Sequence, residues 1–187
     1  MAAGVQAAYD AVARAYHDEF GNELDGKPLD RALLEAFTEL SGAGTIADVG
    51  CGPGHITRLL AARHAHVIGI DVSPGVIRVA RGATAGVRGR LHAADADCAW
   101  SGAIALYSII HLTAGQRARA CRELARTVRP GGWLLVAFHV DSPDFAAREV
   151  NHLTDWFGEP IELDAISSSR ATLCAMSKLR GTRSCPP

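Results

Sequence analysis

Three glycines and one carboxylate have the spacing of a site for a nucleotide-type cofactor. The glycines alternate in the run Gly50-Cys51-Gly52-Pro53-Gly54, directly after the apolar residues 46–49. Asp71 follows a second apolar run, residues 67–70. Glycine allows a tight turn whose backbone comes close to a ligand, and a helix that starts after the turn favours a negative group there. The carboxylate of Asp71 can accept hydrogen bonds from the hydroxyls of a ribose.

The glycine spacing distinguishes between two kinds of cofactor. A dinucleotide-binding loop has the pattern G-x-G-x-x-G, but His55 stands at the position of the third glycine. We therefore expect an adenosine-type cofactor, and a nicotinamide-dependent or nucleotide-sugar enzyme of Rossmann type is the alternative. His55 itself is expected to be a loop residue, because the helix dipole would disfavour its charged form.

His111 is the candidate for a catalytic base. It stands just beyond the apolar run 103–107, and an oxygen nucleophile must lose its proton, most often to a histidine. The alternatives are that His111 contacts the substrate or caps a helix. Cys51 is expected to belong to the glycine loop without acting as a nucleophile. His139 is expected to be structural.

A parallel sheet is needed to bring these residues together. Apolar runs predict five strands, at residues 46–49, 67–70, 90–94, 103–107 and 133–139. Helical patterns lie between most of these runs, and Thr113 is the predicted N-cap of a helix that ends near Val128. The alternation predicts an α/β fold with a doubly wound, mainly parallel sheet and helices on both faces. Ligands of such sheets bind at the carboxyl ends of the strands.

Two further helices are predicted before the glycine loop, at residues 5–20 and 28–40. Tyr9 and Tyr16 lie on one apolar face of the first helix. One interpretation makes both tyrosines core aromatics. The other places this helix over the cofactor loop, so that a tyrosine closes the site.

Three segments of the chain resemble the class I S-adenosylmethionine-dependent methyltransferases. They are residues 48–54, residues 69–74 and the segment 124–132, which ends in the turn Arg129-Pro130-Gly131-Gly132. Their order and spacing are similar to those of the family, and the resemblance covers roughly residues 5–164. The segment 105–112 also resembles the fourth-strand region of members that act on small molecules.

The resemblance implies roles for individual residues. The first motif would wrap the methionine end of S-adenosylmethionine, Asp71 would hold the ribose, and Val72 and Ser73 would flank the adenine. Asp95, with Asp97 as the fallback, would meet the adenine amino group. The predicted cofactor-binding residues are Tyr9, Tyr16, Asp48, Gly50, Cys51, Gly52, Gly54, Asp71, Val72, Ser73, Asp95 and Tyr107.

The implied function is methyl transfer from S-adenosylmethionine to a small molecule, with O- or N-methylation favoured over C-methylation. The Asn-Pro-Pro-Tyr-type motif of members that methylate amino groups in DNA or protein is absent, which argues against those substrates. The alternative, besides a nicotinamide-dependent enzyme, is a non-catalytic cofactor-binding protein derived from the same fold.

Composition limits the class of protein further. The 187 residues fit one domain, and the net charge of −1 gives no electrostatic sign of nucleic-acid or membrane binding. The five cysteines are odd in number and show no C-x-x-C spacing, so neither a disulfide framework nor a metal site is expected. We expect a cytoplasmic monomer or homodimer whose partner is a small-molecule acceptor.

The segment 165–187 departs from the family pattern. It contains no acidic residue and shows no alternating run for a final strand pair, whereas residues 145–153 suggest a helix. We therefore expect a methyltransferase domain over 1–164 and an atypical tail over 165–187, with C-terminal strands missing or altered. The tail is interpreted as an out-of-frame or truncated terminus, and a divergent folded terminus is the alternative.

Overall fold

A mainly parallel five-stranded sheet forms the centre of the molecule. The computed structural model describes residues 2–64, 66–83, 98–137, 150–166 and 175–178. The sheet order is β2 (Val67–Ile70), β1 (Ile46–Val49), β3 (Trp100–Leu106), β4 (Val128–Ala137) and β7 (Ala175–Lys178). The first four strands are parallel, and β7 pairs antiparallel with β4. The predicted fold class is confirmed.

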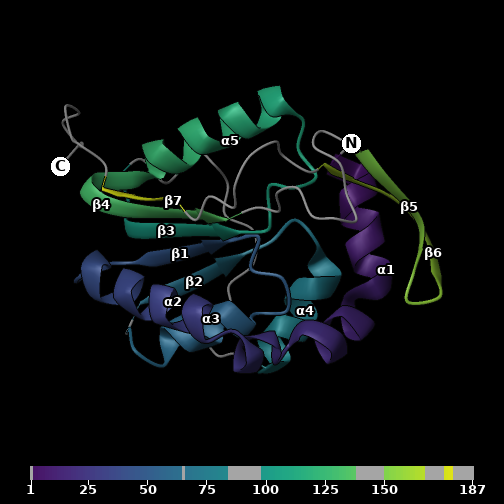
Figure 1. The fold of residues 1–187 in the computed structure, drawn as a ribbon, viewed down its shortest axis with the longest axis horizontal. Coiled ribbons are helices and arrows are strands. Elements are labelled where there is room, and N and C mark those ends of the chain that lie inside the picture. Colours follow the sequence, from purple (N-terminus) through teal and green to yellow (C-terminus); the bar gives the residue numbers. More distant parts are fainter. Residues whose placement is uncertain (1, 65, 84–97, 138–149, 167–174, 179–187) are drawn as a thin grey trace.

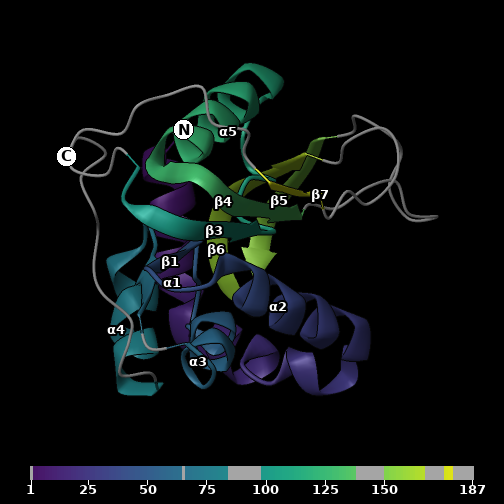
Figure 2. The same cartoon turned by 90° about the vertical axis from the view of Figure 1, so that its left-hand side faces the viewer.

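Helices cover both faces of the sheet (Figures 1 and 2). On one face lies α5 (Ala114–Thr127), and on the other lie α2 (Pro28–Ser41), α3 (His55–Ala61) and α4 (Pro74–Ala83). Thr113 caps α5 and forms a capping box with Gln116, as predicted. The helix α1 (Ala2–Phe20) and the separate hairpin of β5 (Val150–Trp156) and β6 (Glu159–Ile166) stand beside the sheet, on the right of Figure 1.

The central strands are mainly apolar because side chains on both faces of the sheet are buried. In β3, Ile104 packs towards α2 with Phe37 and Leu34, whereas Ala103 and Ala105 pack with Leu124 of α5. This two-sided burial is typical of parallel sheets between helical layers. It fixes the carboxyl ends of β1, β2 and β3 at one edge.

The side chain of Asp10 fastens α1 to the start of α4. Its Oδ1 accepts hydrogen bonds from Ser73 Oγ and from the backbone nitrogen of Gly75, both at 2.6 Å. Ser73 Oγ also accepts from the backbone nitrogen of Val76, as an N-cap does. A Cβ at position 75 would lie 2.8 Å from Asp10 Oδ1, so the close approach of the helices requires glycine.

The predicted helix over 145–153 is wrong for residues 150–153, which belong to strand β5. Leu153 and Trp156 of this strand pack with Ile161 and Leu163 of β6 against α1. Short apolar segments fit either periodicity, and pairing with β6 decides this one. The remaining residues, 145–149, lie outside the described residues.

The carboxyl-terminal part of the chain also differs from expectation. Residues 175–178 form β7, so this part of the expected tail is a strand of the main sheet. Residues 129–132 lie within β4 and not in a separate turn, and the pairing of β3 with β4 is irregular between Trp100 and Gly102. The predicted strand 90–94 and His139 lie outside the described residues.

One cysteine departs from the expectation of reduced thiols. Cys98 is disulfide-bonded, whereas Cys51 and Cys121 have free thiols. Within the described residues, none of the helices combines the length and the apolar character needed to cross a bilayer.

Candidate functional site

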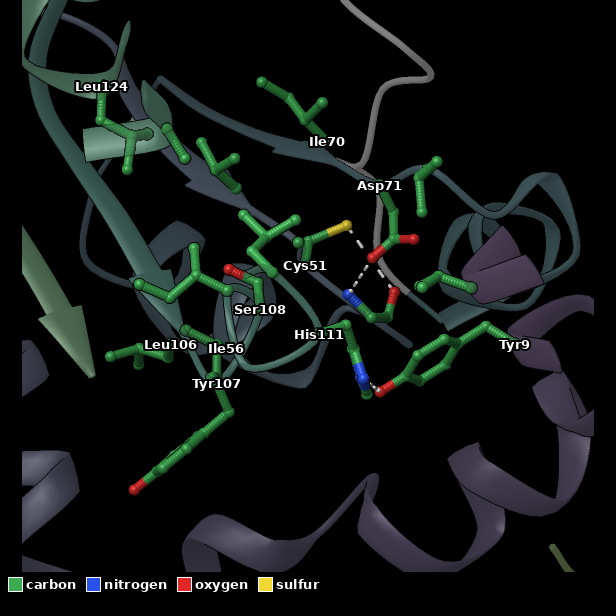
Figure 3. Close-up of a pocket in the computed structure, with 18 of the residues that line it drawn as sticks. Tyr9, Cys51, Ile56, Ile70, Asp71, Leu106, Tyr107, Ser108, His111 and Leu124 are labelled. Carbon is green, nitrogen blue, oxygen red and sulfur yellow. Dashed lines mark hydrogen bonds between the residues drawn. The ribbon is translucent and has the colours of Figure 1, made fainter. Parts of the chain in front are cut away.

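A cavity of about 530 Å³ lies where the loops after β1, β2 and β3 meet α1 (Figure 3). Its wall includes most of the residues that the sequence predicts for the site. These are Tyr9, Tyr16, Gly50, Cys51, Gly52, Asp71, Val72, Tyr107 and His111. The volume is within the usual range for small-molecule sites.

The glycine loop requires its first glycine for two reasons. Gly50 has φ +78°, in the left-handed region, and a Cβ there would lie 2.1 Å from the Cβ of Ser108. The backbone nitrogens of Gly50 and Cys51 both donate to the carbonyl of Ile70, at 2.7 and 3.0 Å. The loops after β1 and β3 can therefore pack directly against each other.

Asp71 ends β2 and faces the cavity beside the glycine loop (Figure 3). Its Oδ2 accepts from the backbone nitrogen of Gly52 at 3.0 Å, and its Oδ1 accepts from that of Ser73 at 2.9 Å. Burial raises the pKa of Asp71, and these backbone hydrogen bonds oppose the rise. Each carboxylate oxygen can accept more than one hydrogen bond, so Asp71 can also accept from hydroxyls of a ligand.

Three predicted residues stand behind the cavity wall. Asp48 is fully buried and accepts a hydrogen bond from Thr57 Oγ1 at 2.6 Å. Ser73 is buried against Asp10, and Gly54 precedes α3. These residues position the loop and α4, and they do not line the cavity. Asp95 and Asp97 lie outside the described residues.

His111 is held in one tautomer by two hydrogen bonds. Its Nδ1 donates to the backbone carbonyl of Asp164 in β6, at 2.7 Å. Its Nε2 then accepts from the hydroxyl of Tyr9, at 2.9 Å, as Figure 3 shows. Burial lowers the pKa of His111 despite the bond to Asp164, and burial raises the pKa of Tyr9. At neutral pH the pair is an uncharged base with an uncharged hydroxyl.

The two tyrosines of α1 belong both to an aromatic cluster and to the cavity wall. Tyr9 and Tyr16 line the cavity, and the rings of both also contact Trp156 of the hairpin, with centroids 5.5 and 5.3 Å away. Burial raises the pKa of Tyr16 to about 12. The aromatic cluster joins α1 to the hairpin at the edge of the cavity.

Tyr107 adopts an unusual backbone conformation at the end of β3. Its φ of +56° is in the left-handed region, which non-glycine residues rarely adopt. Its backbone nitrogen donates to the carbonyl of Ala137 at 2.8 Å. The ring extends away from the Tyr9–His111 pair in Figure 3, and Lys27 Nζ lies 5.7 Å from its centroid.

His55 and Glu23 are cavity residues that the sequence did not indicate. His55 is the first residue of α3 and not a loop residue, and its Nε2 lies 2.9 Å from Glu23 Oε1. Glu23 also pairs with Lys27 at 2.6 Å. The hydrogen bond with His55, together with that from Lys27, lowers the pKa of Glu23 to about 2. For His55, its position directly after Gly54 was a local signal that it could lie at the site. Glu23 has no such signal, because tertiary packing brings it to the cavity.

Two buried polar atoms of the cavity wall lack a hydrogen-bond partner within the described residues. They are Nδ1 of His55 and Oγ of Ser108, which both belong to residues beside the glycine loop. Buried polar groups are normally satisfied. Both residues lie at the part of the wall that the resemblance assigns to the cofactor.

The fold, with its cavity at the carboxyl ends of β1, β2 and β3, defines a Rossmann-like domain with a site for an adenosine-type cofactor. Residues 46–132 match the family model described as "Methyltransferase domain". The matched residues include the three segments whose motifs resemble the class I S-adenosylmethionine-dependent methyltransferases, and the match and the relatives below support that resemblance.

Several relatives are named methyltransferases, and one structural neighbour is a complex with SAH. A trans-aconitate 2-methyltransferase of Methylobacterium nodulans is 29% identical over 82% of this chain and 61% of its own length. A ubiquinone biosynthesis O-methyltransferase of Hydrogenovibrio crunogenus is 25% identical over 85% and 75%. The structure of DhpI in complex with SAH has TM-score 0.70 and 19% identity, covering 90% of this chain and 81% of that one. The chain spans 42% and 61% of two of the trans-aconitate enzymes that it matches.

Proposed function

We propose that this protein binds S-adenosylmethionine in the cavity and transfers its methyl group to a small-molecule acceptor. The observation that carries the proposal is the placement of Asp71 beside the glycine loop, with both facing one cavity. The methyltransferase relatives support the same activity. O- or N-methylation is favoured, because a neutral histidine also lines the cavity.

The described residues fit the cofactor at both ends. Asp71 would accept from the ribose hydroxyls, and Val72 follows it on the cavity wall, where the adenine would lie. Tyr16, Gly50, Cys51 and Gly52 line the part of the wall proposed for the methionine end. When bound, the cofactor supplies an electrophilic methyl group on a sulfonium. The chain contributes alignment, which can account for about 7–11 kcal/mol of a barrier in the best cases.

Calorimetric titration tests the cofactor. We expect S-adenosylhomocysteine to bind the wild type, and NAD not to bind. Tight binding of NAD without S-adenosylhomocysteine binding would favour the nicotinamide-dependent alternative. Binding without turnover of any acceptor would favour a non-catalytic protein.

Asp71→Asn tests the residue at the centre of the proposal. The amide would turn a donor towards a backbone N–H or a ribose hydroxyl and lose the charged acceptor, which is worth about 1.5–3 kcal/mol per hydrogen bond. We expect the calorimetric Kd for S-adenosylhomocysteine to rise at least tenfold. The exposed Asp18→Asn on α1 is the control. An unchanged Kd in folded Asp71→Asn would exclude Asp71 as the ribose ligand.

A further inference from the structure

The acceptor class can be argued from the charges and proton-transfer groups of the cavity. This inference rests on the proposed function, because it assigns the second substrate of the same site. The trans-aconitate names of some relatives would suggest an acceptor with several carboxylates. The charges of the described cavity wall argue against such an acceptor.

The described wall is unsuited to an acceptor with several negative charges. Its ionised residues are the acids Glu23, Asp71 and Glu123 and the base Arg126. With the wall histidines His55 and His111 counted as neutral, the formal sum is one positive minus three negative charges, or −2. Arg126 Nε already lies 2.8 Å from Glu123, and the nearby Lys27 is paired with Glu23. Carboxylates that enter without unengaged cations would lose solvation and meet repulsion.

The Tyr9–His111 pair is a proton acceptor that a carboxylate would not need. An ionised carboxylate is already a nucleophile, whereas a hydroxyl must lose its proton as it attacks. The buried imidazole is neutral, with its Nδ1 fixed on Asp164 and its Nε2 on Tyr9. Tyr9 Oη donates to His111 and keeps lone pairs to accept from a ligand. A phenol, whose ordinary pKa is about 10, is within reach of such a base more readily than an aliphatic alcohol.

Within the described residues, apolar and aromatic side chains also lie around this pair, and the space is limited. Val5, Ile109 and Leu112 line the same cavity, and Tyr16 and Trp156 are in ring contact with Tyr9. A volume of about 530 Å³ must hold both substrates. Such a volume favours a small acceptor.

We infer that the acceptor is a small, uncharged phenol that donates its hydroxyl hydrogen to Tyr9 Oη, with His111 Nε2 as the final proton acceptor. The O–H bond breaks as the oxygen–methyl bond forms, and the Tyr9 hydrogen moves to Nε2. The carbon–sulfur bond breaks, and its electron pair stays on sulfur. The resulting imidazolium is stabilised by the carbonyl of Asp164.

Two acceptors of six carbons test the inference on the full chain. Catechol is the uncharged phenol, and trans-aconitate is the tricarboxylate. We expect calorimetry on protein saturated with S-adenosylhomocysteine to detect catechol and not trans-aconitate. With S-adenosylmethionine, kcat/KM for catechol should exceed that for trans-aconitate at least 100-fold. A preference for trans-aconitate would overturn the inference. So would the absence of catechol binding at about 10 mM, a concentration above the millimolar Kd of a weak ligand.

Variants separate the acceptor from the cofactor. We expect His111→Gln to lower the rate of catechol methylation by about 10²–10⁴-fold. Its affinity for S-adenosylhomocysteine should stay unchanged. Tyr9→Phe should lower the rate of catechol methylation as well. The matched control is His152→Gln, since His152 is exposed on β5 and contacts the side chain of Asp164. Unchanged catechol turnover in His111→Gln would overturn the inference. Failure of the wild type to bind S-adenosylhomocysteine would instead contradict the proposed function.

Discussion

At the scale of single residues, some predicted side chains face the cavity, whereas others hold the glycine loop in place. Asp71 and Asp48 both belong to the resemblance to methyltransferases, but only Asp71 reaches the cavity. Burial raises the pKa of Asp48 to about 6, although Thr57 donates a hydrogen bond that opposes this effect. Asp48 therefore costs stability when it is ionised, and its hydrogen bond with Thr57 fixes the loop to α3.

Asp48→Asn should stabilise the protein in a pH-dependent way. The pKa of about 6 in the folded protein exceeds the ordinary 3.8 of the group. The favourable contribution of protonated Asp48 is therefore complete below pH 3.8 and is lost as pH rises through 6. An amide keeps an acceptor for Thr57 and avoids the charge. Urea denaturation at pH 8 should show a gain on the order of 1–3 kcal/mol, and at pH 5 a smaller one. An equal effect at both pH values would contradict the ionisation argument.

His111 should give the methylation rate a simple pH dependence. Burial lowers its pKa from the ordinary 6.5, and only the neutral imidazole accepts a proton. We expect kcat to be constant above pH 6.5 and to fall as pH decreases through the lowered pKa. The measurement is the pH profile of kcat, corrected for unfolding by circular dichroism. A midpoint above 6.5 would argue against His111 as the group that titrates.

At the scale of elements, α1 supplies Tyr9 and depends on α4 for its position. Tyr9 stands next to Asp10 in the chain, and Asp10 bonds the start of α4. The hairpin of β5 and β6 holds α1 from the other side through Trp156 and through Ile161 and Leu163. The Tyr9–His111 pair thus depends on three elements: α1, the loop after β3, and β6.

Asp10→Ala should loosen α1. The loss of a capping interaction costs about 0.5–2 kcal/mol, which urea denaturation at pH 7 can measure. The hydrogen bonds from Ser73 and Gly75 outweigh burial and lower the pKa of Asp10 below 3.8. Its contribution is therefore present above pH 3.8 and is lost as pH falls through the lowered value. Asp18→Ala, exposed on the same helix, is the control. Equal stability of the two variants at pH 7 would show that the contact is not needed.

At the scale of the whole molecule, the cavity connects the sheet, α1 and α5, so a bound cofactor should stabilise all of them together. At a concentration of 100 times Kd, a ligand of the folded state adds about 2.7 kcal/mol. For a domain of this size, that corresponds to a rise in Tm of about 5–11 °C. Differential scanning calorimetry with S-adenosylhomocysteine measures it, with NAD as the control. The absence of a shift at saturation would contradict binding to the folded state.

The strands at 46–49 and 67–70, the glycine loop and Asp71 could be predicted from the sequence, because local periodicity and glycine spacing encode them. The prediction of a helix over 150–153 failed, because pairing with β6 overrides a short apolar pattern. Other features have no local signal at all. The Tyr9–His111 bond joins residues 102 positions apart, and the contact of Asp10 with Ser73 joins residues 63 apart. The sequence by itself determined that the glycine loop and Asp71 lie together at the carboxyl ends of two parallel strands. Only the tertiary structure decided which side chains face the cavity, since packing between distant segments sets those distances.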